Sequence, residues 1–422
     1  MKIWLVTIGE PFPTADNPNR RLLRTALFGQ HLAKCGHQVT WWCSTFDHAK
    51  KIQLFEKDQI VNWQDNLEVR FLKSRGYKKS ISLSRILDHR EVGNKFINQA
   101  RKMPVPDVIV VSLTPPDLLM KAVTFSKETG CPVAADIRDL WPDVIPEFFP
   151  NWMKPLIKGC LMPMHVMARK ALRGCSGVIG ITEDFVDWAV NKAGREKGEL
   201  DQEIPLTYNV NKVEEVQLEE ARNFWNSKGF NKESQDFIVL YSGSLGVQPD
   251  LATAIEGTRQ LNAEGFAVRL LVCGDGDFRS EFEKMAADVP QVTFAGWVDA
   301  PKILAAMELA TVGLDPLPER FDFLMTINNK AIEYMCVGLP ILLSPRVGLL
   351  HRFLKEHDCG KSYATGNVDE YVTRVKEMIS KNEKTQQMGK NGKKIFDERF
   401  APEKVYKRME NYLFKLKDSV RN

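Results

Sequence analysis

The sequence predicts a parallel α/β protein built from two domains. Short apolar runs alternate with amphipathic stretches of helical period, a pattern typical of strands and helices that succeed one another in parallel sheets. At 422 residues the chain is also too long for one ordinary core, since domains contain about 150 residues. Hydrophobic residues form 44% and charged residues 27% of the chain, which is the balance of a soluble globular protein.

Neither the charge nor the hydropathy of the chain indicates a nucleic-acid-binding or membrane-spanning protein. The net charge is only +4, because 58 scattered basic residues are matched by 54 acidic ones. No apolar run approaches the roughly 18 residues of a membrane span, and Met1 and Lys2 lead directly into a strand without a signal cleavage site. We therefore expect a cytoplasmic protein.

The eight cysteines are expected to be reduced. They occur singly, without a C-x-x-C pair, and Cys131, Cys273 and Cys336 lie inside apolar runs. Buried thiols are therefore favoured over disulfides and zinc ligands, and the sequence predicts no metal site.

The first domain is expected to span residues 1–208. It begins with a strand at 2–8, a loop at 9–19, a helix at 21–35 and a second strand at 38–43. Further strands are predicted at 67–72, 107–112, 132–137 and 177–182, and further helices at 85–102 and 116–129.

The loop after the first strand carries the first candidate ligand contacts. It opens the first helix at the carboxyl edge of the sheet, where open α/β sheets bind their ligands. Gly9, Arg20 and Arg21 lie in or beside this loop. The alternative is an exposed loop with a solvated arginine pair.

A charged block follows the strand at 132–137. Asp136, Arg138 and Asp139 are crowded at its end, and because charges are disfavoured on a buried strand, we expect several of them to face a ligand. The alternative is a structural salt-bridge network of Arg138 with the aspartates. His48 follows the second strand and is a further candidate for contact with a ligand at the same edge of the sheet.

The segment 148–173 combines aromatic and methionine residues with basic residues. It contains no acid, although acids and bases are balanced elsewhere, and Pro155 and Pro163 break any single long helix. Its cations are Lys154, Lys158, Arg169, Lys170 and Arg173. Such a composition favours peripheral contact with an anionic membrane surface, whereas packing in the core is the alternative.

The second domain is expected at 209–400. After a helix at 214–228, the strand 237–243 turns into a helix at 251–261. Gly243, Ser244 and Gly246 lie in this turn, where backbone amides can bind phosphate. Gln248 follows, without a basic residue nearby.

Two further turns are candidates for contact with a nucleotide. The strand 268–273 ends at Gly274, but the dinucleotide fingerprint is incomplete because its third glycine is missing. In the turn 294–299, Gly296 permits close approach, and Trp297 either stacks on a base or packs in the protein. A helix at 401–416 ends the chain.

The stretch 326–344 predicts one short helix that leads into a buried strand. Asn328 or Asn329 is a suitable N-cap, Gly338 can adopt the left-handed stop, and Pro340 prevents continuation. The N-terminus of such a helix favours an anion, for example a diphosphate.

Lys330 and Glu333 are the candidate ligand-binding residues on this helix. Lys330 places a cation in the first turn, where the helix dipole disfavours one, and this indicates that an anion binds there. Glu333 lies three residues later on the same face, and its carboxylate can accept hydrogen bonds from two vicinal hydroxyls of a ribose. The alternative is an ordinary amphipathic helix with a Gly-x-Pro stop.

Two motifs resemble those of a known family. The stretch NKAIEYMCVGLPILLS is similar to the pattern N-K-x-x-E-Y-M-x-x-G-x-P of family 4 glycosyltransferases that assemble bacterial surface polysaccharides, and ADIRDLWP resembles their D-x-R-D-L-W-P block. The resemblance covers nearly the whole chain. It implies the GT-B fold, in which two Rossmann-like domains face each other across a cleft. Two departures are Met325, where the wider family has a first glutamate, and Gln248, where many members have a base.

The resemblance also implies residue roles. Asp139, with Asp136 as the second candidate, would orient or deprotonate the acceptor hydroxyl in domain 1–208. Lys330, or Arg20 from across the cleft, would neutralise the diphosphate of the donor in domain 209–400. The turns at Gly274 and Gly296 would approach the donor, and the segment 401–422 would cross back to the first domain.

The expected function is transfer of a sugar from a nucleotide sugar to a glycan or a polyprenyl-diphosphate-linked glycan. The resemblance implies a UDP-hexose or UDP-N-acetylhexosamine donor, retention of configuration, and no metal or other cofactor. Two alternatives remain. One is a UDP-sugar 2-epimerase of the same fold, and the other is a non-catalytic subunit that binds a nucleotide sugar.

Overall fold

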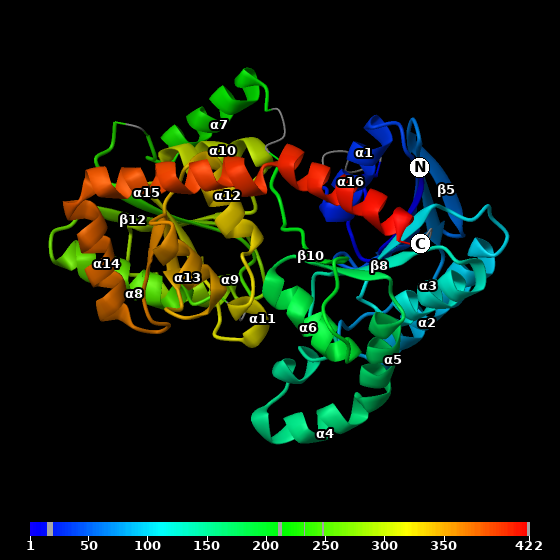
Figure 1. The fold of residues 1–422 in the computed structure, drawn as a ribbon. Coiled ribbons are helices and arrows are strands. Elements are labelled where there is room, and N and C mark those ends of the chain that lie inside the picture. The colour runs from blue at the N-terminus through cyan, green and yellow to red at the C-terminus, as the bar shows by residue number, and fades with distance from the viewer. Residues whose placement is uncertain (15–19, 210–212, 232, 247–248, 420–422) are drawn as a thin grey trace. The chain divides into compact units, whose positions relative to one another are not determined.

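The computed structural model describes residues 1–422 except 15–19, 210–212, 232, 247–248 and 420–422, so that the predicted position of Gln248 lies outside the described residues. The chain forms two compact units (Figure 1). The first consists of Met1–Pro205 and Val405–Asn422, and the second is Leu206–Lys404. The sequence analysis places the corresponding boundaries at 208 and 400.

The first unit is organised around a sheet that has eight strands in the described residues, in the order β10-β9-β8-β7-β1-β2-β6-β5. All neighbours are parallel except β5 and β6, which pair antiparallel at one edge. The strands are β1 Lys2–Val6, β2 Gln38–Ser44, β5 Gln59–Gln64, β6 Leu67–Leu72, β7 Val108–Ser112, β8 Val133–Ile137, β9 Gly177–Gly180 and β10 Asp201–Glu203. A separate hairpin joins β3 Phe46–Asp47 to β4 Ile52–Gln53.

The helices of the first unit connect these strands. They are α1 Arg24–Lys34, α2 Leu83–Ala100, α3 Pro116–Thr129, α4 Lys154–Cys160, α5 Met162–Arg173, α6 Glu183–Ala193 and the final α16 Pro402–Asp418. Pro155 and Pro163 lie in the first turns of α4 and α5, so the predicted break of the segment 148–173 into separate helices is confirmed.

The last helix completes the core of the first unit. Val405, Met409, Tyr412, Leu413 and Leu416 are buried on one face of α16 and pack against a cluster formed by α1 and the central strands. This spacing of four, three, one and three residues is that of an amphipathic helix. The helix predicted at 401–416 is therefore confirmed, and it belongs to the first unit from Val405 onward.

The second unit contains a fully parallel sheet in the order β13-β12-β11-β14-β15-β16. Its strands are β11 Phe237–Ser242, β12 Val268–Cys273, β13 Val292–Gly296, β14 Val312–Pro316, β15 Ile341–Ser344 and β16 Gly360–Ser362. Its helices are α7 Glu215–Ser227, α8 Leu251–Ala263, α9 Arg279–Met285, α10 Ala300–Leu309, α11 Phe321–Leu324, α12 Asn329–Val337, α13 Gly348–Glu356, α14 Val368–Ser380 and α15 Asn382–Ile395.

Helices cover both faces of this second sheet. Successive residues of β11 enter different cores, with Ile238 and Leu240 in one cluster and Val239 and Tyr241 in the other. This alternation is what a strand buried on both faces requires. The predicted α/β class with two Rossmann-like units is confirmed.

One helix boundary differs from the prediction for a physical reason. The helix predicted at 21–35 begins only at Arg24, because the carboxylate of Glu10 accepts hydrogen bonds from the amides of Thr25 at 3.1 Å and Ala26 at 3.4 Å. A residue outside the helix thus supplies the cap, which local sequence patterns do not reveal.

Candidate active site

The carboxyl ends of the strands in the second unit carry most of the predicted donor contacts. Beyond β11 and β12 the chain continues the pairing of the sheet, since Leu245 N donates to Asp275 O at 3.0 Å and Phe278 N to Leu245 O at 2.9 Å. The two turns therefore form one rigid platform.

Close packing explains the glycines of this platform. Gly243 N donates to Cys273 O at 3.0 Å, and a Cβ at Gly274 would lie 1.8 Å from Gly243 O. The amide of Gly274 donates to Gly296 O at 2.8 Å. The amides of Gly243 and Gly274 are thus used within the protein and not for an anion, which corrects the prediction that Gly243 helps to bind phosphate. Ser244 is exposed, and a Cβ at Gly246 would meet no atom within 4 Å, so these two residues lie on the open side of the turn.

The helix α12 begins at this edge as the sequence predicts. Asn328 is its N-cap, accepting from Ala331 N at 2.9 Å, whereas Asn329 is the exposed first residue of the helix. Gly338 ends the helix with φ of +74°, the left-handed conformation expected of it.

Lys330 lies over the ends of β11 and β14. Its Nζ is 3.6 Å from Oδ1 of Asp315 and 5.3 Å from the centroid of the Tyr241 ring, and a Cβ at Gly243 would lie 3.5 Å from it. The Lys330 side chain is 24% exposed, so its ammonium is available at the edge of the sheet.

Asp315 is a site residue that the sequence analysis does not single out. It is fully buried at the end of β14, and Asn328 Nδ2 donates to its Oδ2 at 2.6 Å. Burial raises the pKa of Asp315, while the charge of Lys330 and the hydrogen bond from Asn328 oppose the increase. The sequence signal that could have identified Asp315 is a carboxylate inside an apolar strand. The same pattern draws attention to Asp136.

Glu333 is nearly covered by protein. It is 5% exposed, one helical turn after Lys330. A ribose contact would therefore use the small exposed part of its carboxylate.

Trp297 projects into solvent directly after β13. It is 77% exposed, which excludes the alternative that it packs in the core. Gly296 has φ of +72°, and a Cβ there would lie 3.0 Å from Nη1 of Arg279. Arg279 stands at the position of the missing third glycine of the dinucleotide fingerprint. It pairs with Glu283 at 2.7 Å and lies 3.6 Å from Asp275, and it adds a cation beside the Gly296 turn.

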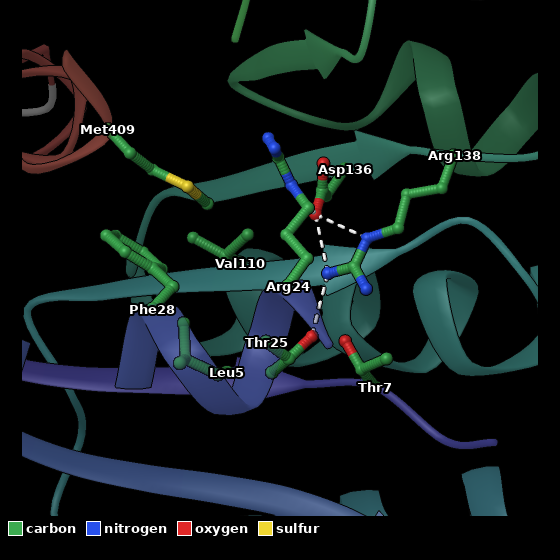
Figure 2. A pocket seen from close by; sticks show the side chains of 9 residues that line it. All are labelled: Leu5, Thr7, Arg24, Thr25, Phe28, Val110, Asp136, Arg138 and Met409. Carbon is green, nitrogen blue, oxygen red and sulfur yellow. Dashed lines mark hydrogen bonds and ion pairs between the residues drawn. The ribbon is translucent and has the colours of Figure 1, made fainter. Parts of the chain in front are cut away.

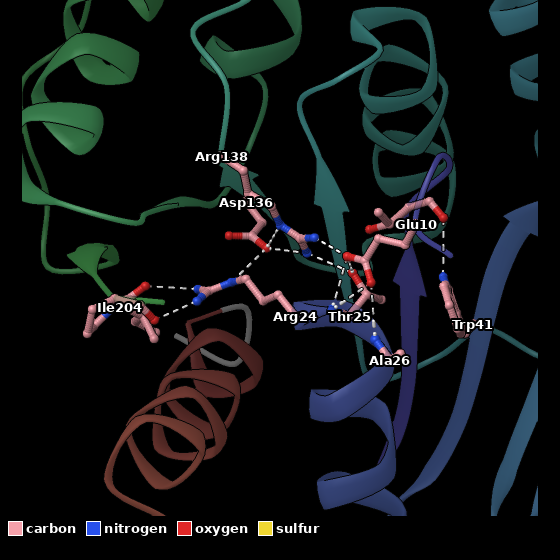
Figure 3. A network of polar contacts seen from close by, with 10 residues as sticks. Glu10, Arg24, Thr25, Ala26, Trp41, Asp136, Arg138 and Ile204 are labelled. Atoms are coloured by element: carbon pink, nitrogen blue, oxygen red, sulfur yellow. Dashed lines mark hydrogen bonds and ion pairs between the residues drawn. The ribbon is translucent and has the colours of Figure 1, made fainter. Parts of the chain in front are cut away.

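In the first unit, a buried polar network joins β8 to the start of α1 (Figure 3). Arg24 Nε donates to Asp136 Oδ2 at 3.2 Å, and Arg138 Nε donates to the same oxygen at 2.8 Å. Arg138 also pairs with Glu10 and donates to Thr25 Oγ1 at 2.7 Å. Asp136 and Arg138 thus form the salt-bridge network that the sequence analysis gives as the alternative.

Asp136 is a counter-ion and not an accessible base. Its side chain is fully buried, and the charges of Arg138 and Arg24 hold its pKa below the usual range although burial acts in the opposite direction. Figure 2 shows both guanidinium groups converging on Asp136 at a small pocket that Thr25 and Met409 also line. This corrects the proposal of Asp136 as a second acceptor-side base.

The remaining predicted residues of the first unit differ in accessibility. Asp139 is exposed two residues beyond β8. Arg20 forms an ion pair with Asp47 and is 12% exposed, whereas Arg21 is exposed. His48 Nδ1 lies 2.6 Å from the hydroxyl of Tyr77.

Two sheets, one fully parallel and one parallel except for its edge strand β5, are each covered by helices and carry charged residues at the carboxyl edge, and they define an α/β protein with two Rossmann-like domains. Residues 236–381 match the family Glycosyl transferases group 1. The chain therefore has the fold of GT-B glycosyltransferases. No match was found among curated proteins.

Several solved structures share this fold along nearly the whole chain. Sucrose-phosphate synthase from Thermosynechococcus elongatus is 15% identical, with a TM-score of 0.72 and 99% of each chain covered. Anabaena HepE in complex with UDP is 16% identical, with a TM-score of 0.66 over 98% of this chain and 100% of that one. WaaG, a glycosyltransferase involved in lipopolysaccharide biosynthesis, is 14% identical, with a TM-score of 0.59 and 99% of each chain covered.

Proposed function

We propose that the protein transfers a sugar from a UDP-hexose or UDP-N-acetylhexosamine derivative to a glycan or polyprenyl-diphosphate-linked glycan in surface-polysaccharide synthesis. The position of Lys330 carries this proposal. Its ammonium lies at the carboxyl edge of a parallel sheet, beside the glycine turn and at the start of α12. A cation and a helix N-terminus at one point fit the diphosphate of a nucleotide sugar.

The donor would bind along this edge of the second unit. Lys330 and the N-terminal amides of α12 would offset the charge that develops on the leaving diphosphate as the sugar acquires oxocarbenium character. Trp297 would stack on the base and Glu333 would accept hydrogen bonds from the ribose. No metal is required in this scheme, because the protein supplies the positive charge.

The acceptor would bind at the first unit. Asp139 is the exposed carboxylate after β8, and it would orient the acceptor hydroxyl and accept its proton. We propose retention of anomeric configuration from the motif resemblance. The UDP complex of HepE and the role of WaaG in lipopolysaccharide biosynthesis favour a UDP donor and a surface glycan as product.

The helices α4 and α5 support the proposed contact with a membrane surface. Figure 1 shows α4 extending away from the sheet of the first unit, and none of its seven residues is buried. Trp152 is 79% and Leu156 65% exposed, at a spacing of four residues, and Met162 and Val166 repeat this spacing on α5 at 56% and 45%. Exposed apolar stripes flanked by cations and free of acids fit the interface of anionic lipid. In the described residues, no helix has the length and apolarity to cross a bilayer.

The function is tested by donor binding and turnover. A thermal-shift panel of UDP-, GDP-, ADP- and CMP-sugars should show stabilisation by one UDP-sugar. Incubation of that sugar with and without acceptor glycans then separates transfer from 2-epimerisation, which needs no acceptor. Substitution of Glu333 by Ala should abolish turnover, whereas a non-catalytic subunit shows no turnover in the wild type. EDTA should leave the rate unchanged.

The membrane contact is tested by flotation with vesicles. We expect binding to vesicles of phosphatidylglycerol mixed with phosphatidylcholine and not to phosphatidylcholine alone. The double substitution Trp152→Glu and Leu156→Glu should remove this binding. Ile60→Glu, at an exposed position on β5, is the matched control and should not change it. Equal binding by both variants would contradict the assignment of this surface.

A further inference from the structure

A cluster of basic and aromatic side chains lies at the carboxyl edge of the sheet in the first unit. We call it the basic aromatic cluster. Its members come from the segments that follow β2, β6 and β8 and from the start of α2, and β2, β6 and β8 run parallel. The members are His48, Lys51, Tyr77, Arg85, His89 and Trp141.

Arg85 is at the centre of this cluster. Its guanidinium carbon lies 4.5 Å from the ring centroid of Trp141 and 5.6 Å from that of Tyr77. Its Nε donates to Nε2 of His89 at 3.4 Å, and its Nη1 donates to the carbonyl of Ser80 at 2.8 Å. All of these direct partners of the guanidinium are neutral at pH 7.

Lys51 also lies near the ring of Tyr77. Its Nζ is 4.8 Å from the Tyr77 ring centroid, 3.0 Å from Ser80 Oγ and 3.2 Å from His48 Nδ1. Two cations thus share one aromatic ring, and repulsion between like charges favours a bound anion between them.

These cations lack the counter-ions that other arginines of the unit possess. Among the described residues, no carboxylate lies within 4.0 Å of the charged nitrogens of Arg85 or Lys51. The nearby Asp47 pairs with Arg20, and Asp88 accepts from Gly76 N at 2.7 Å. The charges of Asp139 and Asp88 act on Arg85, and that of Asp47 acts on Lys51, in each case without a direct ion pair.

Burial makes the missing counter-ions costly. It lowers the pKa of Arg85 and of Lys51, and it lowers the pKa of His48 to about 4 and of His89 to about 3, so both rings are neutral near pH 7. A guanidinium and an ammonium held without a carboxylate form a site for the oxygens of phosphate.

We propose that the basic aromatic cluster binds a phosphate group of the glycosyl acceptor. This inference rests on the proposed transfer function and adds the chemical class of the acceptor. Asp139 precedes Trp141 by two residues, so a phosphate at Arg85 would bring a neighbouring hydroxyl toward the exposed carboxylate of Asp139. The phosphate can belong to a sugar phosphate or to a prenyl diphosphate linked to a glycan.

The test measures binding of defined probes to the full chain. Saturating UDP at constant ionic strength occupies the donor site, so that an anion cannot bind at Lys330. Calorimetry then compares glucose 1-phosphate with glucose and farnesyl diphosphate with farnesol. We expect the anionic member of at least one pair to bind ten times more tightly than its neutral counterpart. The pair with the larger effect identifies a soluble or a lipid-linked acceptor.

Substitutions locate the site. Arg85→Gln and Lys51→Gln should each weaken binding of the anionic probe at least tenfold. Arg90→Gln is the matched control, because Arg90 lies on the same helix, is 62% exposed and should change binding less than twofold. Arg85→Lys should restore part of the affinity.

Anionic probes that bind no better than neutral ones, or that bind both variants like the wild type, would overturn the proposal. Thermal unfolding shows whether Arg85→Gln still folds. If it does not, the Lys51→Gln variant tests the proposal, because Lys51 is partly exposed. The binding assay requires no turnover. A protein that binds phosphate at Arg85 but transfers no sugar would therefore contradict the proposed function and leave the anion site intact.

Discussion

The ammonium of Lys330 lies 3.6 Å from a carboxylate oxygen of Asp315, a residue that solvent does not reach. The other oxygen of Asp315 holds Asn328, the cap of α12, through a bond of 2.6 Å. One buried carboxylate thus fixes both the start of the helix and the cation on its first turn. An incoming diphosphate would share this cation with Asp315.

Lys330→Met should weaken binding of UDP by a factor of about ten to a hundred, since a charge-assisted contact contributes about 1.5–3 kcal/mol. Calorimetric titration with UDP measures the change. Lys394→Met is the control, because the Lys394 side chain is 74% exposed on α15, and it should bind UDP like the wild type. An unchanged affinity in Lys330→Met would remove the basis of the proposed donor site.

Asp315→Ala should lower the free energy of unfolding of the second unit by about 1–3 kcal/mol, because it leaves the partly buried amide of Asn328 without its acceptor. Chemical denaturation provides the measurement. The exposed Asp277→Ala should stay within about 0.5 kcal/mol of the wild type. Equal stability of the two variants would show that Asp315 does not organise the start of α12.

Trp297→Ala should reduce affinity for UDP without reducing stability. Its ring is 77% exposed, so its loss removes little packing, whereas stacking of an aromatic ring on a base contributes about 1–3 kcal/mol. We expect binding of UDP to weaken at least fivefold and the unfolding temperature to stay constant. Trp297→Phe should retain most of the affinity. A fall in the unfolding temperature would instead indicate that Trp297 packs against the protein.

Gly274→Ala should destabilise the second unit by more than about 3 kcal/mol, because its Cβ would lie 1.8 Å from Gly243 O and because φ is +148°. Gly246→Ala, where a Cβ meets no atom within 4 Å, should be tolerated. Thermal unfolding of the two variants makes the comparison. Similar unfolding temperatures would mean that the two turns do not pack as described.

The first unit should lose stability as the pH falls below 6.5. His89 is 5% exposed and faces Arg85 and His48, so that burial lowers its pKa to about 3, whereas the unfolded chain binds a proton near pH 6.5. Between these values the unfolded state binds more protons. His89 alone should therefore lower the free energy of unfolding by about 1.4 kcal/mol per pH unit on acidification, and His48, whose pKa burial lowers to about 4, adds a loss of the same sign. His89→Gln should flatten this slope in denaturation curves recorded between pH 6.5 and 4.5, and an unchanged slope would exclude His89 as its source.

Helices and strands whose ends depend on residues close in sequence could be predicted. Asn328, Gly338 and Pro340 act within a few residues of α12, and the structure places the helix and the following strand where they predict. Apolar runs predicted β6 and β12 at their observed bounds for the same reason.

Contacts between distant residues could not be predicted in this way. The start of α1 depends on Glu10, the role of Asp136 depends on Arg24, and the use of the Gly243 amide depends on a strand thirty residues later. The antiparallel edge strand β5 lacks a distinctive apolar run, because it is only half covered. These features arise from tertiary pairing, which a pattern along the chain does not contain.

The packing of α16 in the first unit has a consequence for synthesis of the chain. Nearly two hundred residues of the second unit separate Pro205 from Val405. The nascent first unit emerges from the ribosome long before the helix that covers part of its interior. During that interval Phe28 and Leu32 of the same cluster remain in contact with water, so the growing polypeptide presents a surface that chaperones recognise until translation is finished.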